Sequence, residues 1–152
     1  MKIEFYFFDK LRVSETMQTI TYTRSDNYLI FGALRFACDS AHFITSDIYY
    51  DFECLIRSAG TDAFEDQFNK LQYLALRMNE HLVSQLTTVY HNVDKSMTIA
   101  DCLTEFMNRL KFIQDLHNKK TNTTLSFETR AGGRIVVDPA DLLDPVTTTK
   151  TE

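Results

Sequence analysis

The chain has 152 residues, of which 44% are hydrophobic and 24% are charged, with four Gly and two Pro. This composition is typical of one globular domain and excludes the fibrous and disordered classes, and a chain of this length buries about 70% of its unfolded surface. The formal net charge of −5 opposes attraction to phosphate backbones, so no nucleic acid is expected as a partner.

The cysteines indicate a reducing compartment. Cys38, Cys54 and Cys102 are odd in number and widely spaced, whereas small secreted proteins carry dense, even sets. The first residues soon meet Asp9 and lack the apolar core of a signal peptide. No apolar stretch of the sequence approaches the roughly 20 residues that cross a bilayer. We therefore expect a cytoplasmic protein with no membrane partner.

Two segments near the start predict strands. Residues 3–8 are rich in aromatic side chains on both faces of an extended chain, and residues 18–23 alternate Thr with Ile20 and Tyr22. The polar residues 9–16 join the two segments, so we expect a β-hairpin.

Two helices are expected next. Residues 28–42 are apolar almost all around a helix, which predicts a buried helix with Ser25 or Asp26 as its N-cap. A second helix, capped by Thr45 or Ser46, should end near Ser58, where Gly60 supplies a stop.

A long antiparallel helical hairpin is expected between residues 64 and 117. The first helix should run from about residue 61 to Val89 and the second from Thr98, which forms a capping pair with Asp101, after a loop at residues 91–97. Apolar side chains repeat every seven residues along both helices and form seams. Gln85 interrupts the first seam. The seams are Phe64, Leu71 and Met78; Phe68, Ala75, Leu82 and Val89; Ile99, Phe106 and Ile113; and Leu103, Leu110 and His117.

The C-terminal part predicts a second β-hairpin over residues 125–137, with its turn at Ala131, Gly132 and Gly133. The expected fold is α+β: a small antiparallel sheet from the N-terminal strands and the C-terminal hairpin, packed on four helices. Residues 1–138 form one domain in this interpretation, and residues 139–152 form an extended acidic and Thr-rich tail.

One group of residues could carry chemistry. Cys38 and His42 are four residues apart, so on a helix both could reach one metal ion or pair as thiolate and imidazole, with Cys54 as a third ligand. Structural zinc needs four ligands, however, and free cysteines are commonly buried as small hydrophobic residues. We therefore expect no catalytic residue, no metal and no cofactor.

Two segments predict a protein-binding surface. Aromatic residues alternate with carboxylates over residues 47–53, and such aromatic side chains are common at protein interfaces. Two leucines flanked by Asp in the tail could dock on a partner. The expected protein-binding residues are Tyr49, Tyr50, Asp51, Phe52, Glu53, Leu142 and Leu143.

These observations favour a non-enzymatic protein that binds another protein stoichiometrically, as an inhibitor, an immunity-type neutraliser or an assembly subunit. Its acidic charge suits a partner with a basic surface. One alternative is a small metal-dependent or Cys/His enzyme that uses Cys38 and His42. Another alternative is a homo-oligomeric structural subunit whose tail docks on a neighbouring copy.

Overall fold

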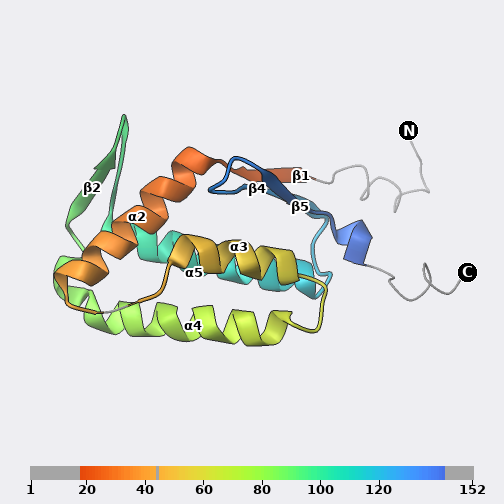
Figure 1. Ribbon diagram of the computed structural model, residues 1–152, viewed down its shortest axis with the longest axis horizontal. Coiled ribbons are helices and arrows are strands. Elements are labelled where there is room, and N and C mark those ends of the chain that lie inside the picture. Colours follow the sequence, from red (N-terminus) through yellow and green to blue (C-terminus); the bar gives the residue numbers. More distant parts are fainter. Residues whose placement is uncertain (1–17, 44, 143–152) are drawn as a thin grey trace, which may run out of the picture.

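The computed structural model describes residues 18–43 and 45–142, and Figure 1 shows how their helices and strands are arranged. Within these residues, four long helices form the body, a three-stranded sheet packs on it, and a two-stranded hairpin projects at the far end. The α+β class with four helices is confirmed. The elements are β1 (Gln18–Tyr22), α2 (Arg24–Ser40), α3 (Ile48–Ser58), α4 (Phe64–His81), η1 (Val83–Gln85), β2 (Val89–Asn92), β3 (Lys95–Thr98), α5 (Ile99–His117), β4 (Thr123–Glu128), β5 (Arg134–Val137) and η2 (Pro139–Leu142).

The three-stranded sheet has the order β1-β4-β5 and is mixed. β4 and β5 form the expected antiparallel hairpin, whose turn places Gly132 at a φ of 93°, a conformation that favours glycine. β1 pairs with β4 in parallel, whereas an antiparallel sheet was expected, because the helices between them return the chain to the same end of the sheet. The strand predicted at residues 3–8 lies outside the described residues.

Helix α2 begins four residues before the predicted start. Thr23 is its N-cap, and its hydroxyl accepts a hydrogen bond from the Asp26 backbone N–H at 3.2 Å. Helix α3 is capped by Asp47 rather than by Thr45 or Ser46, since the Asp47 carboxylate accepts from a backbone N–H of the first turn. Gly60 follows the end of α3 with a φ of 83°, as its predicted role requires.

Helix α4 ends at His81, about two turns before the predicted end. The chain continues through η1 into the antiparallel hairpin β2–β3, so the expectations of a helix to Val89 and of a loop at residues 91–97 were wrong. The run Thr87, Thr88, Val89 is β-branched and favours a strand over a helix. Gln85 lies outside the helix seam, where its side-chain amide donates to the Ala37 carbonyl at 3.1 Å.

Helix α5 begins as predicted. The Thr98 hydroxyl caps it by accepting from the Asp101 N–H at 3.1 Å, and the helix lies antiparallel to α4 (Figure 1). At one end of the pair, the Phe64 ring stacks on His117 with centroids 4.0 Å apart. Except for the half-buried His117, the seam side chains of α4 and α5 are buried in one core with α2, α3 and the sheet.

A buried cation joins the layers. The Arg109 side chain is 1% exposed, donates to Asn27 Oδ1 at 2.7 Å and to Glu105 at 3.2 Å, and lies 3.9 Å from the Tyr22 ring centroid. Asn27 in turn donates to the Glu128 carbonyl at 3.0 Å. Burial lowers the Arg109 pKa, but an arginine side chain stays protonated. This network therefore connects α2 and α5 with strands β1 and β4.

The predicted tail starts with a packed turn. Residues Pro139–Leu142 form η2, Pro139 is buried, and Leu142 is half-buried against the core. A Cβ atom added at Gly60 would meet the Leu142 side chain, so the two segments are in close contact. Leu143, the second predicted docking leucine, lies outside the described residues, as does the rest of the predicted tail.

Candidate protein-binding groove

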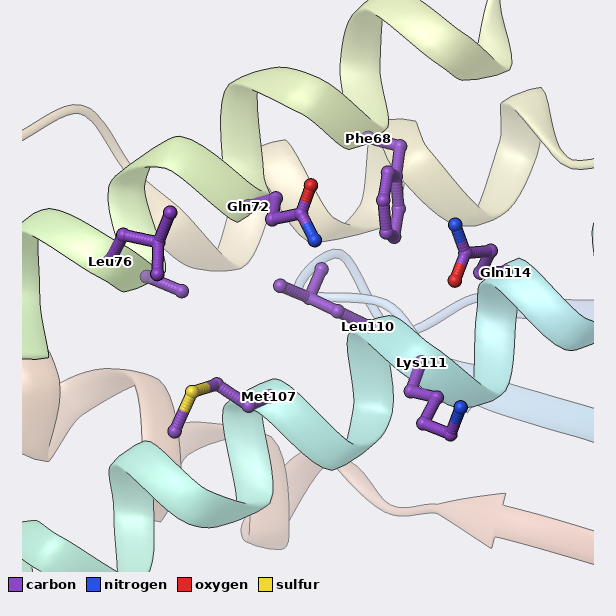
Figure 2. A pocket seen from close by; sticks show the side chains of 8 residues that line it. Phe68, Gln72, Leu76, Met107, Leu110, Lys111 and Gln114 are labelled. Atoms are coloured by element: carbon purple, nitrogen blue, oxygen red, sulfur yellow. The ribbon is translucent and has the colours of Figure 1, made fainter.

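A groove of about 300 Å³ runs between α4 and α5 on the side of the pair that faces away from α2 and α3 (Figure 2). Phe68 and Gln72 point from α4 toward α5, and Leu110 points back toward α4. The groove is lined by Phe68, Gln72, Ala75, Leu76, Met107, Leu110, Lys111 and Gln114.

The floor and the rim of the groove differ in exposure. Phe68, Ala75 and Leu110 belong to the buried seams and form an apolar floor. Leu76 and Met107 lie beside those seams and are 59% and 38% exposed. Both rim positions carry large apolar side chains where a helix ordinarily turns polar residues to water. A partner that covered the groove would bury these two side chains and gain about 1.5–3 kcal/mol from each if burial were complete.

Two rows of residues follow the groove along its helices. Each row advances by three and four residues in turn, so its members share one helix face. One row, on α4, is Glu65, Asn69, Gln72, Leu76 and Asn79; the other, on α5 and its C-cap, is Thr104, Met107, Lys111, Gln114 and Asn118. Gln114 is half-buried and the other nine are exposed. Of the eight residues that line the groove, only Lys111 is charged, although 24% of the chain is charged, and depletion of charge is typical of the centre of a protein interface.

The groove can bind but offers little chemistry. Its lining holds two amides, Gln72 and Gln114, and one titratable group, the Lys111 ammonium. General acid–base or nucleophilic catalysis needs a positioned proton acceptor, and the lining contains no carboxylate, imidazole or thiol. The arrangement therefore suits the burial of apolar side chains from another molecule.

The predicted aromatic surface on α3 is mostly buried. Tyr49 and Phe52 are core residues, Asp51 and Glu53 are buried too, and only Tyr50 is well exposed, at 56%. The expectation that these five side chains form one exposed surface was therefore wrong for four of them. The helical period of α3 turns Tyr49 and Phe52 inward, and both rings pack near Phe127.

The two buried carboxylates have structural partners. Asp51 accepts from the Ser46 hydroxyl at 2.5 Å, and Lys70 lies 3.5 Å away. Glu53 accepts from the Arg130 backbone N–H at 2.6 Å. These contacts hold α3 against its neighbours and leave neither carboxylate directed at a ligand.

The aromatic and basic side chains on the other side of α4 are paired with one another. Arg77 donates to the Tyr73 hydroxyl at 2.9 Å and approaches a His81 ring nitrogen at 3.1 Å. His81 stacks on Phe43 with ring centroids 4.6 Å apart. Because the terminal nitrogens of Arg77 already contact Tyr73 and His81, this side is a weaker binding candidate than the groove.

The structure does not assemble the predicted Cys and His cluster. Cys38 is fully buried in α2, and burial raises its pKa to about 11. The helix ends at Ser40, so His42 lies beyond it at a φ of 57° and is exposed. Cys54, on α3, is partly buried. In the part of the chain that the structure describes, no three His, Cys, Asp or Glu side chains come together as a metal site.

Sequence reasoning missed Leu76 and Met107. The only signal was an apolar residue beside a seam on each of two helices, and pairing the two requires the register of the helices.

The comparison of the chain with protein-family models, curated proteins and solved structures gave no match. None of the helices in residues 18–43 and 45–142 combines the length and the apolar character needed to cross a membrane.

Proposed function

We propose that this chain is a non-enzymatic protein that acts by stoichiometric binding to a protein partner through the groove between α4 and α5. The observation that carries the proposal is the apolar rim of Leu76 and Met107 above a buried apolar floor, in a groove whose lining holds a single charge. Such a surface gains affinity from burial, which suits an inhibitor, a neutraliser or an assembly subunit.

The charge of the groove sets the kind of partner it accepts. The net charge of −5 favours encounter with a basic protein at other surfaces. In the lining of the groove, however, the one charge is the cation Lys111. A partner of the groove should therefore present apolar and neutral polar side chains, for example along an amphipathic helix.

Site-specific photocrosslinking tests the proposal. A photoreactive benzoylphenylalanine is placed at Leu76 or, as the matched control, at Val136 on β5, since the two side chains are 59% and 57% exposed. Both full-length variants are expressed in cells and irradiated, and the adducts are separated by mass. We expect a discrete protein adduct from position 76 and none of the same mass from position 136.

A second substitution makes the result specific to the groove. Adding Met107→Asp to the position 76 chain places an unpaired charge across the groove, and we expect the adduct to disappear while the circular dichroism spectrum is unchanged. Equal adduct patterns at the two positions, or an adduct that survives Met107→Asp, would overturn the proposal.

A further inference from the structure

We infer that the protein docked on the α4–α5 groove is a second copy of this chain, so that α4 and α5 of the two copies form a symmetric four-helix arrangement. This inference rests on the proposed function and names its partner. It follows from three properties of the two rows that flank the groove: their neutral amides, their lack of net acidic charge, and their area.

The amides make the face complementary to itself. Five of the ten row residues are Asn or Gln: Asn69, Gln72, Asn79, Gln114 and Asn118. An amide group both donates and accepts hydrogen bonds, so two identical amide faces can pair without any partner of opposite charge. The exposed Leu76 and Met107 would meet equivalent apolar groups across a twofold axis, because an isologous interface brings the same patch together twice.

Charge selects this face for self-association. Two copies that each carry −5 repel one another over most orientations. The groove face carries little of this repulsion, since its rows contain one carboxylate, Glu65, and one lysine, Lys111, whose charges cancel. The approach of two acidic copies is therefore least unfavourable with the groove faces together. Salt should strengthen the association by screening the remaining repulsion, whereas salt weakens the binding of a basic partner.

The area is sufficient for a weak dimer. A helix of 18 residues such as α4 is about 27 Å long, and two helices about 10 Å apart present a strip about 20 Å wide. The flat footprint is then roughly 500 Å² per copy, and the corrugated accessible area that two copies bury is on the order of 1,200 Å². This value lies at the low end for specific interfaces, so we expect a dissociation constant in the micromolar range.

Sedimentation equilibrium of the purified full-length chain tests the inference directly. Measured from about 1 µM to about 500 µM, the mass should rise from 17.7 kDa toward twice that value and stop there, because an isologous contact closes at two copies. Leu76→Asp should raise the dissociation constant about tenfold or more, since each copy would bury an unpaired carboxylate. Val136→Asp adds the same charge at a matched exposure and should change the dissociation constant by less than about threefold.

Each other result counts against the dimer. A mass of one copy over the whole concentration range overturns the inference, and so does growth beyond two copies, which indicates a head-to-tail contact. Equal weakening by Leu76→Asp and Val136→Asp overturns it as well, because that result reflects net charge and not the groove. Weaker association at higher salt also overturns the inference, because screening should strengthen the approach of two acidic copies. Circular dichroism melting of both variants checks that each remains folded.

The crosslinking experiment separates this inference from the proposed function. An adduct from position 76 at twice the mass of the chain supports both. An adduct with another protein, together with a monomeric purified chain, preserves the proposed function and removes the dimer. Failure of position 76 to crosslink any protein removes both.

Discussion

Arg109 is the largest side chain that is fully buried in the described residues, and its charge is satisfied inside the protein. Its guanidinium reaches Asn27 and Glu105 by hydrogen bonds and lies over the Tyr22 ring. A buried cation of this kind does not by itself add stability relative to an apolar residue of the same shape, but removing it takes the donor away from Asn27 Oδ1 and from the Glu105 carboxylate.

We predict that Arg109→Ala lowers the free energy of unfolding by about 3–5 kcal/mol, since Asn27 and Glu105 lose their donor and a cavity remains. Arg134→Ala is the control, because Arg134 also donates to a side-chain hydroxyl, on Ser126, but is half exposed. It should cost less than about 1 kcal/mol. Urea unfolding followed by circular dichroism measures both, and equal losses would contradict the structural role of Arg109.

The pair formed by Asp47 and Arg130 should make stability depend on pH. The hydrogen bonds from the Arg130 guanidinium hold the pKa of the Asp47 carboxyl below its usual range. The stabilisation from this carboxylate is therefore present above the ordinary aspartate pKa of about 3.9 and is lost as the pH falls through the folded value.

Asp47→Asn isolates that charge, since asparagine is also a good N-cap. Asp47 accepts from the Tyr50 N–H at 3.1 Å as the N-cap of α3, and this hydrogen bond should survive. We expect the variant to be less stable at pH 7 and the difference in unfolding free energy to shrink as the pH falls below the ordinary aspartate pKa of about 3.9. A difference that does not change between pH 7 and pH 3, measured by thermal melting, would contradict the ion pair.

The cysteines should differ in reactivity. Burial raises the pKa of Cys38 and of Cys102 to about 11, so about one molecule in a thousand carries either thiolate at pH 8. Cys54 is only partly buried. We expect iodoacetamide to alkylate Cys54 first in the folded protein and the other two only after urea is added, as read by peptide mass spectrometry. Early labelling of Cys38 would revive the nucleophile alternative.

At the scale of elements, the β2–β3 hairpin holds an unusual residue at its tip. Val93 has a φ of 59°, which is uncommon for a β-branched residue, and its side chain is 94% exposed. The hairpin contacts α2 at two levels: Tyr90, nearer its base, approaches Gly32, and Lys95, in the strand pair next to the turn, forms an ion pair with Asp26. The strain at the tip is therefore a local cost that no packing of this side chain offsets.

Val93→Gly should stabilise the protein by about 1 kcal/mol, because glycine adopts this backbone conformation without a clash. Val89→Gly in the neighbouring strand β2 is the control: Val89 is also exposed but lies in an ordinary strand, where glycine should destabilise by about 0.5–1 kcal/mol. Urea unfolding of both variants checks the sign. Destabilisation by Val93→Gly would contradict the strained turn.

Periodicity predicted the helices well but not where α4 ends. The seam spacing continues through Leu82 to Val89, and spacing alone contains no stop signal. The β-branched run at Thr87, Thr88 and Val89 was the available signal, and it favoured the strand that the structure shows. A local preference and a helical period competed there, and the local preference determined the structure.

The candidate groove was harder to predict because exposure depends on packing between elements. On α3, aromatic residues alternating with carboxylates resembled an exposed surface, yet Tyr49 and Phe52 fill the core, and Asp51 and Glu53 find partners from other segments. For the groove, the missing information was the position of the neighbouring helix. The apolar side chain of Leu76 becomes part of a surface only when α5 is placed beside it.

At the scale of the whole molecule, the two sheets should differ in cooperativity. The three-stranded sheet packs on the helices through buried side chains such as Phe127 and shares the Arg109 network. The β2–β3 hairpin has two strands, and most of its residues are exposed. An isolated pair of strands has little stability of its own.

We predict that backbone amides of β4 exchange hydrogen only through global unfolding, whereas those in the outer half of the hairpin exchange through local opening. Hydrogen exchange followed by mass spectrometry across a series of urea concentrations separates the two cases. Exchange in β4 should accelerate steeply with urea, and exchange near Asn92 should hardly respond. A strong urea response at Asn92 would mean that the hairpin opens only with the whole domain.

The parallel pairing of β1 with β4 has a consequence for biosynthesis. The Arg24 backbone N–H, next to β1, donates to the Glu128 carboxylate, 104 residues further along the chain. At about 5–20 residues per second, a ribosome needs roughly 5–20 s to make the intervening segment. During that time the Ile20 and Tyr22 side chains of β1 lack the strand that covers them. Strand β1 is therefore open to chaperones and proteases while the intervening segment is made, and this exposure ends only when β4 leaves the ribosome.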